Sequence, residues 1–159
     1  MGLDMYLKGV KYFNTCTYEH EAIGGDFVKK INPLYQSIAE YYDIEIDDEF
    51  GIGVVEMPVM YWRKANQIHK WFVDNTQGGK DKNCEPTPVT KEQLQKLLDD
   101  VTFVLEHKDP SVLPPQSGFF FGSTDIDDFY WEDLNDTRSG LEKLLKADKF
   151  ESFIYQSSW

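Results

Sequence analysis

Hydrophobic and polar positions alternate near the start of the chain. Leu3, Met5 and Leu7 are each separated by one residue. A period of two is typical of a strand that has one buried face. We therefore predict a strand over residues 3–12, followed by an irregular segment over residues 14–30.

The next part of the chain is expected to form a helix, two short strands and a second helix. Proline suits the first turn of a helix, so Pro33 is predicted to begin a helix over residues 33–42. Isoleucines alternate with acidic residues at 44–46, and a further strand is predicted over residues 52–57. A longer helix is expected over residues 60–75.

The second half of the chain has clearer helix signals. Residues 76–89 are loop-like, and Thr90 with Gln93 forms the sequence pattern of a capping box. The helix behind this capping box carries one apolar stripe, which predicts that it packs in the interior. Three consecutive phenylalanines predict a buried strand over residues 117–121, and a further helix is expected over residues 125–145.

The elements together predict an α+β fold. About three main helices are expected to pack on a small, mostly antiparallel sheet, with the tail FIYQSSW as an edge strand. A chain of 159 residues with 41% hydrophobic residues is expected to form a single globular domain over residues 1–159. Cys16 and Cys84 have no CxxC pattern and no histidine at metal-ligand spacing. We therefore expect free thiols, no metal, no cofactor and a cytoplasmic location.

The chain is strongly acidic, with a formal net charge of −12. Acidic residues gather in two segments, 43–56 and 125–136, and neither segment contains Lys or Arg. Such surfaces repel nucleic acids and anionic membranes, so direct binding of nucleic acid is not expected. No apolar run approaches the roughly 18 residues that a membrane helix needs. The acidic segments are interpreted either as solvated surfaces or as surfaces that occupy a basic groove on another protein.

Residues 61–72, YWRKANQIHKWF, place three cations and one histidine among four aromatic residues. On the predicted helix, Trp62, Asn66 and His69 line one edge between an apolar face and a polar face. One interpretation is packing, in which the indole and imidazole groups bond to structural partners. The other interpretation is the wall of a pocket that holds a planar ligand.

Cations support the pocket interpretation. Arg63, Lys64 and Lys70 supply positive charge in an otherwise acidic chain. Phosphate is recognised by forked or ammonium donors, and a nucleobase stacks on an aromatic face. The combination predicts a site for an anionic, nucleotide-like molecule.

Residues 116–134 contain a second group of unusual positions. Gly118 and Gly122 bracket three phenylalanines, and glycine permits a close backbone approach or a positive φ. Thr124 is expected to cap the following helix, whose first amides point outward as anion donors. Three aspartates at the start of that helix oppose a phosphate there, so we expect them to pair with the cations of residues 61–72.

The sequence contains none of the common catalytic motifs, neither GxSxG nor a P-loop nor HExxH. No activating neighbour is visible beside either cysteine. A binding protein is therefore favoured over an enzyme, although catalytic groups that meet only in the fold leave no sequence motif.

Three blocks of the sequence are long and unusual in composition: MGLDMYL, YWRKANQIHKWFVDN and LPPQSGFFFGSTDIDDFYWEDL. They resemble a family of small proteins, without an assigned activity, that tailed phages and bacteria encode. The resemblance covers residues 1–8, about 56–76 and about 112–134. It implies no catalytic residues. It implies a setting in which small phage proteins counter host defences, either by sequestering nucleotide signals or by covering protein effectors.

We therefore expect a non-enzymatic protein that binds an anionic nucleotide-like molecule, in the manner of a phage counter-defence factor. The expected ligand-binding residues are Trp62, Arg63, Lys64, Asn66, His69, Lys70, Phe121, Ser123 and Thr124.

Two alternatives stay open. The first is an inhibitor that binds a host protein through the acidic segments 43–56 and 125–136. The second is an enzyme that processes nucleotides. Arg63 and Lys70 point away from the core face of the predicted helix, so closure of the site by a second subunit also stays open.

Overall fold

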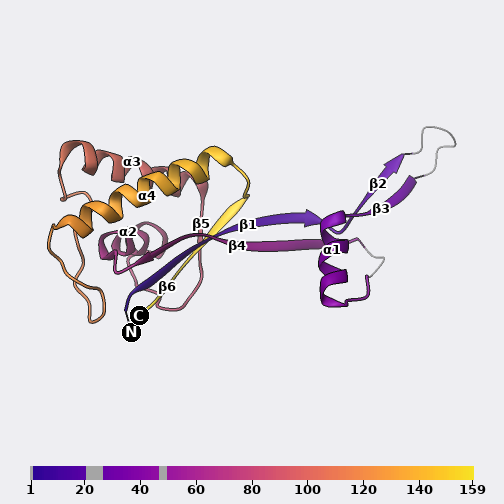
Figure 1. Ribbon diagram of the computed structural model, residues 1–159, viewed down its shortest axis with the longest axis horizontal. Coiled ribbons are helices and arrows are strands. Elements are labelled where there is room, and N and C mark those ends of the chain that lie inside the picture. Colours follow the sequence, from indigo (N-terminus) through magenta and orange to yellow (C-terminus); the bar gives the residue numbers. More distant parts are fainter. Residues whose placement is uncertain (1, 21–26, 47–49) are drawn as a thin grey trace. The chain divides into compact units, whose positions relative to one another are not determined.

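A computed structural model describes residues 2–20, 27–46 and 50–159. Figure 1 shows the helices and strands in chain order. They are β1 (Asp4–Asn14), β2 (Cys16–His20), β3 (Phe27–Ile31), α1 (Pro33–Tyr42), β4 (Ile52–Arg63), α2 (Asn66–Thr76), β5 (Thr87–Val89), α3 (Lys91–His107), α4 (Asp128–Ala147) and β6 (Ser152–Ser158).

The strands form one larger sheet and one hairpin. The larger sheet has the strand order β4-β1-β6-β5, in which β6 is antiparallel to both of its neighbours. Strands β2 and β3 form a separate antiparallel pair. The fold is therefore α+β with a mostly antiparallel sheet, as the sequence predicts, and it has one more helix than the three expected.

The chain divides into two compact units. Unit 1 comprises Met1–Val10 and Glu56–Trp159, and unit 2 comprises Lys11–Val55. Strands β1 and β4 each contribute residues to both units. The single-domain organisation of the chain stays a prediction, and the units are described separately.

The core of unit 1 lies between the sheet and its helices. Leu3, Met5 and Leu7 are fully buried, and the alternation that predicts β1 comes from this buried face. The ring of Tyr155 on β6 stacks on Phe72 of α2, with 3.9 Å between the ring centroids. Helices α3 and α4 lie side by side (Figure 1). Their facing residues complete the core: Leu94, Leu97, Val101, Val104, Leu134 and Leu141.

Polar contacts around Thr15 join three parts of unit 2. Its backbone N–H donates to Gly51 O at 2.9 Å, and its Oγ accepts from Gly51 N at 2.8 Å. The backbone N–H of Asn32 donates to Thr15 O at 2.9 Å, and the Asn32 side chain caps α1 by accepting from Leu34 N. These contacts tie the start of α1 and the start of β4 to one turn of the chain.

Local sequence signals predict several elements correctly. Helix α1 begins at Pro33 and ends at Tyr42, as expected. The capping box of α3 is present in both directions, because Thr90 Oγ accepts from Gln93 N and Gln93 Oε1 accepts from Thr90 N. Both cysteines are free thiols, as predicted.

Two predictions for residues 14–46 are wrong. Residues 14–30 are not irregular throughout, because β2 lies within them and β3 begins at Phe27. Residues 44–46 form no strand, since the chain leaves α1 through a left-handed residue, Asp43, with φ of 53°. The acidic residues 47–49 lie outside the described residues.

The most consequential error concerns residues 60–63, which are strand rather than helix. Strand β4 continues to Arg63, and the chain then turns at Lys64, which has φ of 62°. Helix α2 begins only at Asn66. A helical arrangement of Trp62 and Arg63 is therefore wrong, and these residues alternate across a strand, with Trp62 buried and Arg63 exposed.

The second half of the chain has four further differences. Residues 117–121 form a loop instead of a buried strand, because Gly118 lets the ring of Phe121 fold back onto the backbone. Helix α4 begins at Asp128 with Asp127 as its cap, so Thr124 is not the cap. The loop-like segment ends with the short strand β5, and β6 lies inside the sheet rather than at its edge.

Among the described residues, no helix has the length and apolar character required to cross a bilayer.

Candidate functional site

Three stretches of unit 1 that are distant in sequence meet at Leu3. Its backbone N–H donates to Phe120 O at 3.1 Å, and its carbonyl accepts from Lys64 N at 2.8 Å. The turn at Lys64, which follows β4, and the loop of residues 117–121 are therefore both hydrogen-bonded to the backbone of Leu3. These are also the three sequence blocks that carry the family resemblance.

Asn66 holds the loop before α4 in place. Its Nδ2 donates to Phe121 O at 3.1 Å and to Ser123 O at 2.8 Å. Its Oδ1 accepts from Gln116 N at 2.9 Å. Because the amide is buried and bonded at both ends, the contacts of Asn66 are structural.

His69 lies at the centre of a buried polar cluster. Its Nε2 is 2.9 Å from Asp81 Oδ2, and its Nδ1 is 2.8 Å from the hydroxyl of Tyr155. A carboxylate can only accept, so Nε2 carries a proton, and in the neutral ring Nδ1 accepts from the hydroxyl. Burial raises the pKa of Tyr155, which keeps this hydroxyl a donor. The imidazole is fully buried, so His69 does not face solvent.

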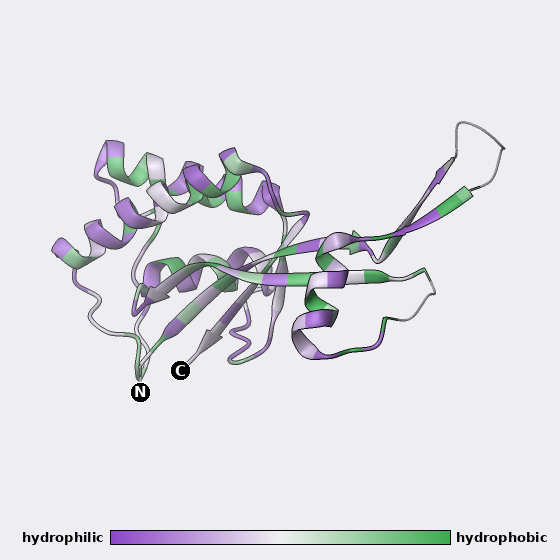
Figure 2. Ribbon diagram, turned by 45° about the vertical axis from the view of Figure 1, so that its right-hand side comes forward, coloured by the Kyte–Doolittle hydropathy of each residue, from purple (hydrophilic) through white to green (hydrophobic). Residues whose placement is uncertain are grey.

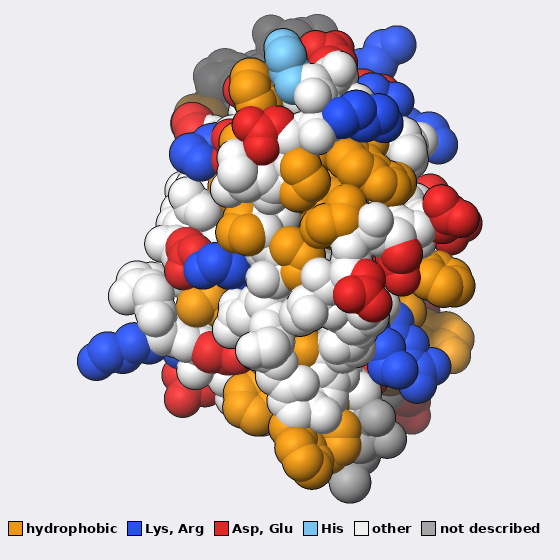
Figure 3. Space-filling view, turned by 90° about the vertical axis from the view of Figure 1, so that its left-hand side faces the viewer, with side chains coloured by type: hydrophobic (Ala, Val, Ile, Leu, Met, Phe, Trp, Pro, Cys, Tyr) orange, Lys and Arg blue, Asp and Glu red, His pale blue; other side chains and the backbone are white. Residues whose placement is uncertain are grey.

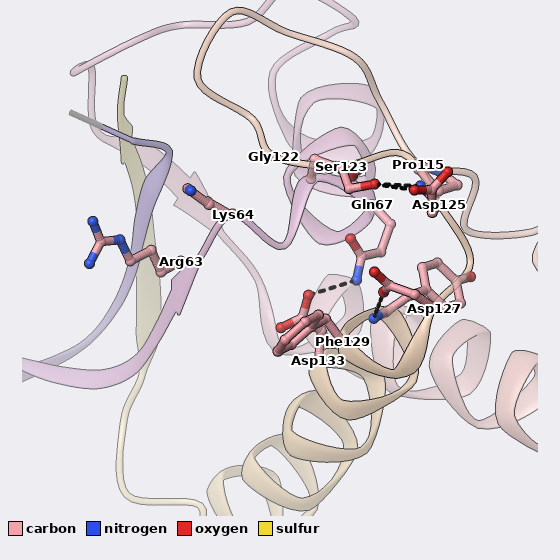
Figure 4. Close-up of a pocket in the computed structure, with 12 residues that line it drawn as sticks. Arg63, Lys64, Gln67, Pro115, Gly122, Ser123, Asp125, Asp127, Phe129 and Asp133 are labelled. Carbon is pink, nitrogen blue, oxygen red and sulfur yellow. Dashed lines mark hydrogen bonds between the residues drawn. The ribbon is translucent and has the colours of Figure 1, made fainter.

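A cavity of about 360 Å³ lies beside these contacts, within unit 1. Figure 4 shows its walls, which come from the end of β4, the start of α2, the loop before α4 and the first turns of α4. Arg63 and Lys64 line one side, and Phe129 and Asp133 line the α4 side. Gln67 of α2 lies between the two sides.

The carboxylates of the cavity are engaged to different degrees. Asp125 accepts from Ser123 Oγ at 2.9 Å, and Asp127 accepts from Tyr130 N at 3.1 Å as the cap of α4. Asp133 Oδ2 accepts from Gln67 Nε2 at 3.1 Å. Its other oxygen has no hydrogen-bond partner among the residues that the structure describes.

Burial raises the pKa of Asp133 to about 6. The hydrogen bond from Gln67 opposes this shift, and the nearby carboxylates of Asp136, Glu132 and Asp127 add to it. Asp133 is therefore close to half-protonated slightly below neutral pH. It can accept two hydrogen bonds as a carboxylate or donate one as an acid.

Phe129 supplies an aromatic surface beside this carboxyl group. Its side chain is 74% exposed, and it precedes Asp133 by four residues, so both lie on the same face of α4. Figure 3 views unit 1 from the side where α4 begins and shows hydrophobic side chains near the middle of that face, among acidic and basic ones.

The cations do not point at the carboxylates. In Figure 4 the charged ends of Arg63 and Lys64 are directed away from Asp125, Asp127 and Asp133. Arg63 Nε is 3.9 Å from Asp4 Oδ1, at the limit of an ion pair. The prediction that the α4 aspartates pair with these cations is wrong for the described ion pairs, because Lys70 pairs with Asp74.

The structure brings four of the nine predicted site residues to this cavity. These four are Arg63, Lys64, Asn66 and Ser123.

The remaining five lie elsewhere, and their ligand roles stay predictions. His69 and Phe121 are in the core, and Thr124 is exposed but does not line the cavity. Lys70 lines a small cavity of about 100 Å³. Trp62 lines a neighbouring cavity of about 270 Å³, which shares Arg63 and Asp133 with the main one.

The buried indoles follow the packing interpretation. Trp62 Nε1 donates to Thr137 Oγ at 2.8 Å, which fixes β4 to α4. Trp71 Nε1 donates to Asp100 Oδ2 at 2.8 Å, which fixes α2 to α3.

Sequence reasoning missed Gln67, Phe129 and Asp133 as members of the site. The four-residue spacing of Phe129 and Asp133 was a usable signal, because it places both on one face of the expected helix. Gln67 had no such signal, since its neighbours on the wrongly extended helix were assigned to the solvent side.

Among the described residues, no group of three or more metal-ligating side chains gathers at one point. No protein-family model, curated protein or solved structure matches this chain. The resemblance to the family of small phage and bacterial proteins therefore stays a prediction, and the argument for function rests on the cavity.

Proposed function

We propose that this protein binds a small nucleotide-like molecule in the cavity between β4, α2 and α4, without converting it. The observation that carries the proposal is Asp133, a partly buried carboxyl group with one oxygen held by Gln67 and the other without a hydrogen-bond partner among the described residues. That oxygen is accessible from the cavity, so a donor on a ligand can take the place of water there.

The acceptors at the α4 side favour a ligand with N–H donors. Asp133 Oδ1 and the side-chain amide oxygen of Gln67, Oε1, form no hydrogen bond within the described residues. They belong to two side chains that are hydrogen-bonded to each other and that both line the cavity. Phe129 offers the face on which such a ring stacks.

The cations favour an anionic group at the mouth of the cavity. Arg63 and Lys64 contribute their aliphatic stems to the wall and direct their charged ends outward (Figure 4). The Arg63 side chain is 62% exposed, so it is accessible to a phosphate at the rim. A nucleotide combines a ring that carries N–H donors with a phosphate at its other end.

The size of the cavity fits this class of ligand. Small-molecule sites commonly range from about 300 to 1,000 Å³, and the cavity of about 360 Å³ is at the lower end. The resemblance to small phage proteins supports a role in sequestering such a molecule from a host defence system.

The proposal is tested by identifying what the protein carries out of the cell. The protein is purified, denatured, and its released small molecules are analysed by mass spectrometry. The double variant Arg63→Ala/Phe129→Ala removes two exposed cavity residues, and Phe119→Ala/Lys82→Ala removes a matched exposed pair away from the cavity.

We expect an intact nucleotide-like ion from the wild type and the control pair, and its loss from the cavity pair. Release of the same ion from the cavity pair contradicts the site. The identified nucleotide is then added to the purified protein, and recovery of a converted product contradicts binding without conversion and supports a nucleotide-processing enzyme.

A further inference from the structure

Residues 40–46, EYYDIEI, form an exposed acidic and apolar surface at the end of α1 in unit 2, which we call the α1 end segment. Tyr41 is 80% exposed, Tyr42 is 66% exposed and Ile44 is 55% exposed. Glu40, Asp43 and Glu45 are exposed between them. In Figure 2 hydrophobic and hydrophilic residues follow one another along α1.

The end of α1 is ordered by its cap rather than by burial. Asp43 adopts a left-handed conformation, and its N–H points to the carbonyls of Ala39 and Glu40. The N–H of Ile44 donates to Ala39 O at 2.9 Å, which completes a Schellman-type ending. The rings of Tyr41 and Tyr42 meet edge to face, with 4.8 Å between their centroids. These side chains are therefore presented on a fixed backbone.

The described residues of unit 2 include few buried hydrophobic side chains and many exposed ones. Among its described residues, Cys16 and Ala39 are the fully buried hydrophobic side chains. A unit of this size buries too little surface to be stable on its own contacts alone, and contiguous exposed apolar surface marks interaction sites. Tyrosines on a rigid backbone are also among the residues that contribute most to protein interfaces.

The negative charge of unit 2 indicates which kind of partner binds the α1 end segment. Residues 11–55 contain nine acidic residues and three lysines. In the described part of the chain, no Lys or Arg forms an ion pair with Glu40, Asp43 or Glu45. A second copy of the chain would bring the same negative charge against it, which is unfavourable, whereas a basic partner gains at each carboxylate.

We propose that the α1 end segment is a docking surface for a protein with an apolar centre and a rim of lysine or arginine. Tyr41, Tyr42 and Ile44 fill the apolar centre, and Glu40, Asp43 and Glu45 pair with the rim. The acids of residues 125–136 are a poorer candidate, because Asp127 caps α4 and both Asp127 and Asp133 are partly buried. Glu40, Asp43 and Glu45 are all exposed, although Glu40 accepts one hydrogen bond from Gln36 Nε2 of its own helix. The proposal does not depend on the cavity.

The test measures binding of a defined probe to the full chain. The probe is a fluorescent amphipathic helix peptide made of leucine and lysine, and a leucine–glutamate peptide of the same pattern serves as the charge control. The variants are Tyr41→Ser/Tyr42→Ser and Glu40→Gln/Asp43→Asn/Glu45→Gln, and asparagine at position 43 tolerates the left-handed backbone.

Matched controls remove equivalent groups from unit 1. Phe119→Ser removes an aromatic side chain that is 89% exposed, and Asp99→Asn/Glu106→Gln/Glu142→Gln removes three exposed acids. Circular dichroism and thermal unfolding establish that all variants are folded, which is expected because the replaced side chains are exposed.

We expect saturable binding of the leucine–lysine peptide, a loss of about tenfold or more in the tyrosine variant and a loss of severalfold in the acid variant. The unit 1 controls should bind as the wild type does. Equal losses in the control variants, or no binding, overturn the proposal. Self-association in sedimentation that disappears in the tyrosine variant also overturns it, because the occupant is then a second copy.

Discussion

The buried His69 cluster and the Asp133 cavity contain similar polar groups in very different states. His69 is fully buried, and both of its ring nitrogens have protein partners, Tyr155 and Asp81. Asp133 is partly buried, and within the described part of the chain only one of its oxygens has a hydrogen-bond partner, Gln67. The His69 ring has both of its nitrogens paired within the chain, although Asp81 Oδ1 is buried without a hydrogen-bond partner among the described residues. Asp133 instead leaves one acceptor at a cavity.

The difference separates structural polar groups from candidate binding groups. Histidine beside cations and aromatics suggested a site at residues 61–72, yet the imidazole supports the core. Asp133 combines a raised pKa with an open acceptor at a cavity, whereas the raised pKa of Tyr155 belongs to a hydroxyl that is bonded in the core. The proposed site therefore rests on an acceptor that is open to a cavity, and not on residue type alone.

Replacing His69 with alanine should have the largest effect on stability. The change opens a cavity and leaves Asp81 and Tyr155 without partners, so the free energy of unfolding should fall by roughly 3–5 kcal/mol. Urea denaturation followed by circular dichroism measures this. Lys70→Ala, one residue along the same helix, should change it by less than about 0.5 kcal/mol. A His69→Ala loss below about 1 kcal/mol contradicts the structural role.

Asn66→Ala should have the next largest effect, because it removes three hydrogen bonds to the loop before α4. We expect a loss of roughly 2–3 kcal/mol in the free energy of unfolding. Amide hydrogen exchange should also accelerate over residues 116–123 relative to α3. Thr124→Ala, a matched change in the same loop, should leave the exchange rates unchanged, and unchanged rates in Asn66→Ala would rule out the anchoring role.

Phe129→Ala should weaken ligand binding and leave stability nearly unchanged. Loss of one stacking face lowers affinity by about tenfold, equivalent to about 1.4 kcal/mol. The side chain is exposed, so the free energy of unfolding should change by no more than about 0.5 kcal/mol. Calorimetric titration with a nucleoside monophosphate measures the affinity. If Phe119→Ala weakens binding equally, the aromatic surface of the site is misassigned.

Asp133→Asn should produce a smaller effect with a distinct dependence on pH. The folded-state pKa of about 6 exceeds the ordinary value of 3.8, so the folded chain holds the extra proton between these values. The stabilising contribution of this proton is complete below about pH 4 and is lost as pH rises through about 6.

Asparagine has no titrating carboxyl group, so the Asp133→Asn variant does not lose this stability as the pH rises. After allowance for partial exposure, the variant should be more stable than the wild type at pH 7 by about 1 kcal/mol. Thermal unfolding from pH 4 to 7 measures the difference, with Asp99→Asn as the exposed control. If the stabilities of the wild type and of Asp133→Asn change in parallel over this pH range, the titration of Asp133 does not contribute to stability and the prediction is contradicted.

The sequence predicts elements that depend on local signals. Pro33 at the start of α1 and the capping box at Thr90 act over a few residues, so both can be read directly. Gly118 and Gly122 were also correctly identified, because an added Cβ at Gly118 would lie 2.5 Å from the Phe121 ring and Gly122 has φ of 90°.

Elements that depend on distant partners could not be predicted in the same way. Tyr61, Trp62 and Arg63 fit a helical pattern, and only pairing in the sheet makes them a strand. The state of Asp133 depends on Gln67, which lies 66 positions earlier in the chain. No spacing rule connects two residues so far apart in the sequence. Arg63 and Lys64 can therefore be predicted from the sequence as candidate site residues, whereas Asp133 cannot.

The central claim is that the cavity beside Asp133 receives the ring of a nucleotide. The most direct measurement is an NMR titration of the nitrogen-15-labelled protein with the four ribonucleoside monophosphates and with ribose 5-phosphate as the control without a base. We predict saturable shifts of the Gln67 side-chain amide and of the backbone amides of Ser123 and Phe129 with at least one nucleotide. Ribose 5-phosphate should shift the signals near Arg63 and Lys64 only. If no nucleotide shifts the Gln67 amide, or if the shifts occur outside the cavity, the claim is contradicted.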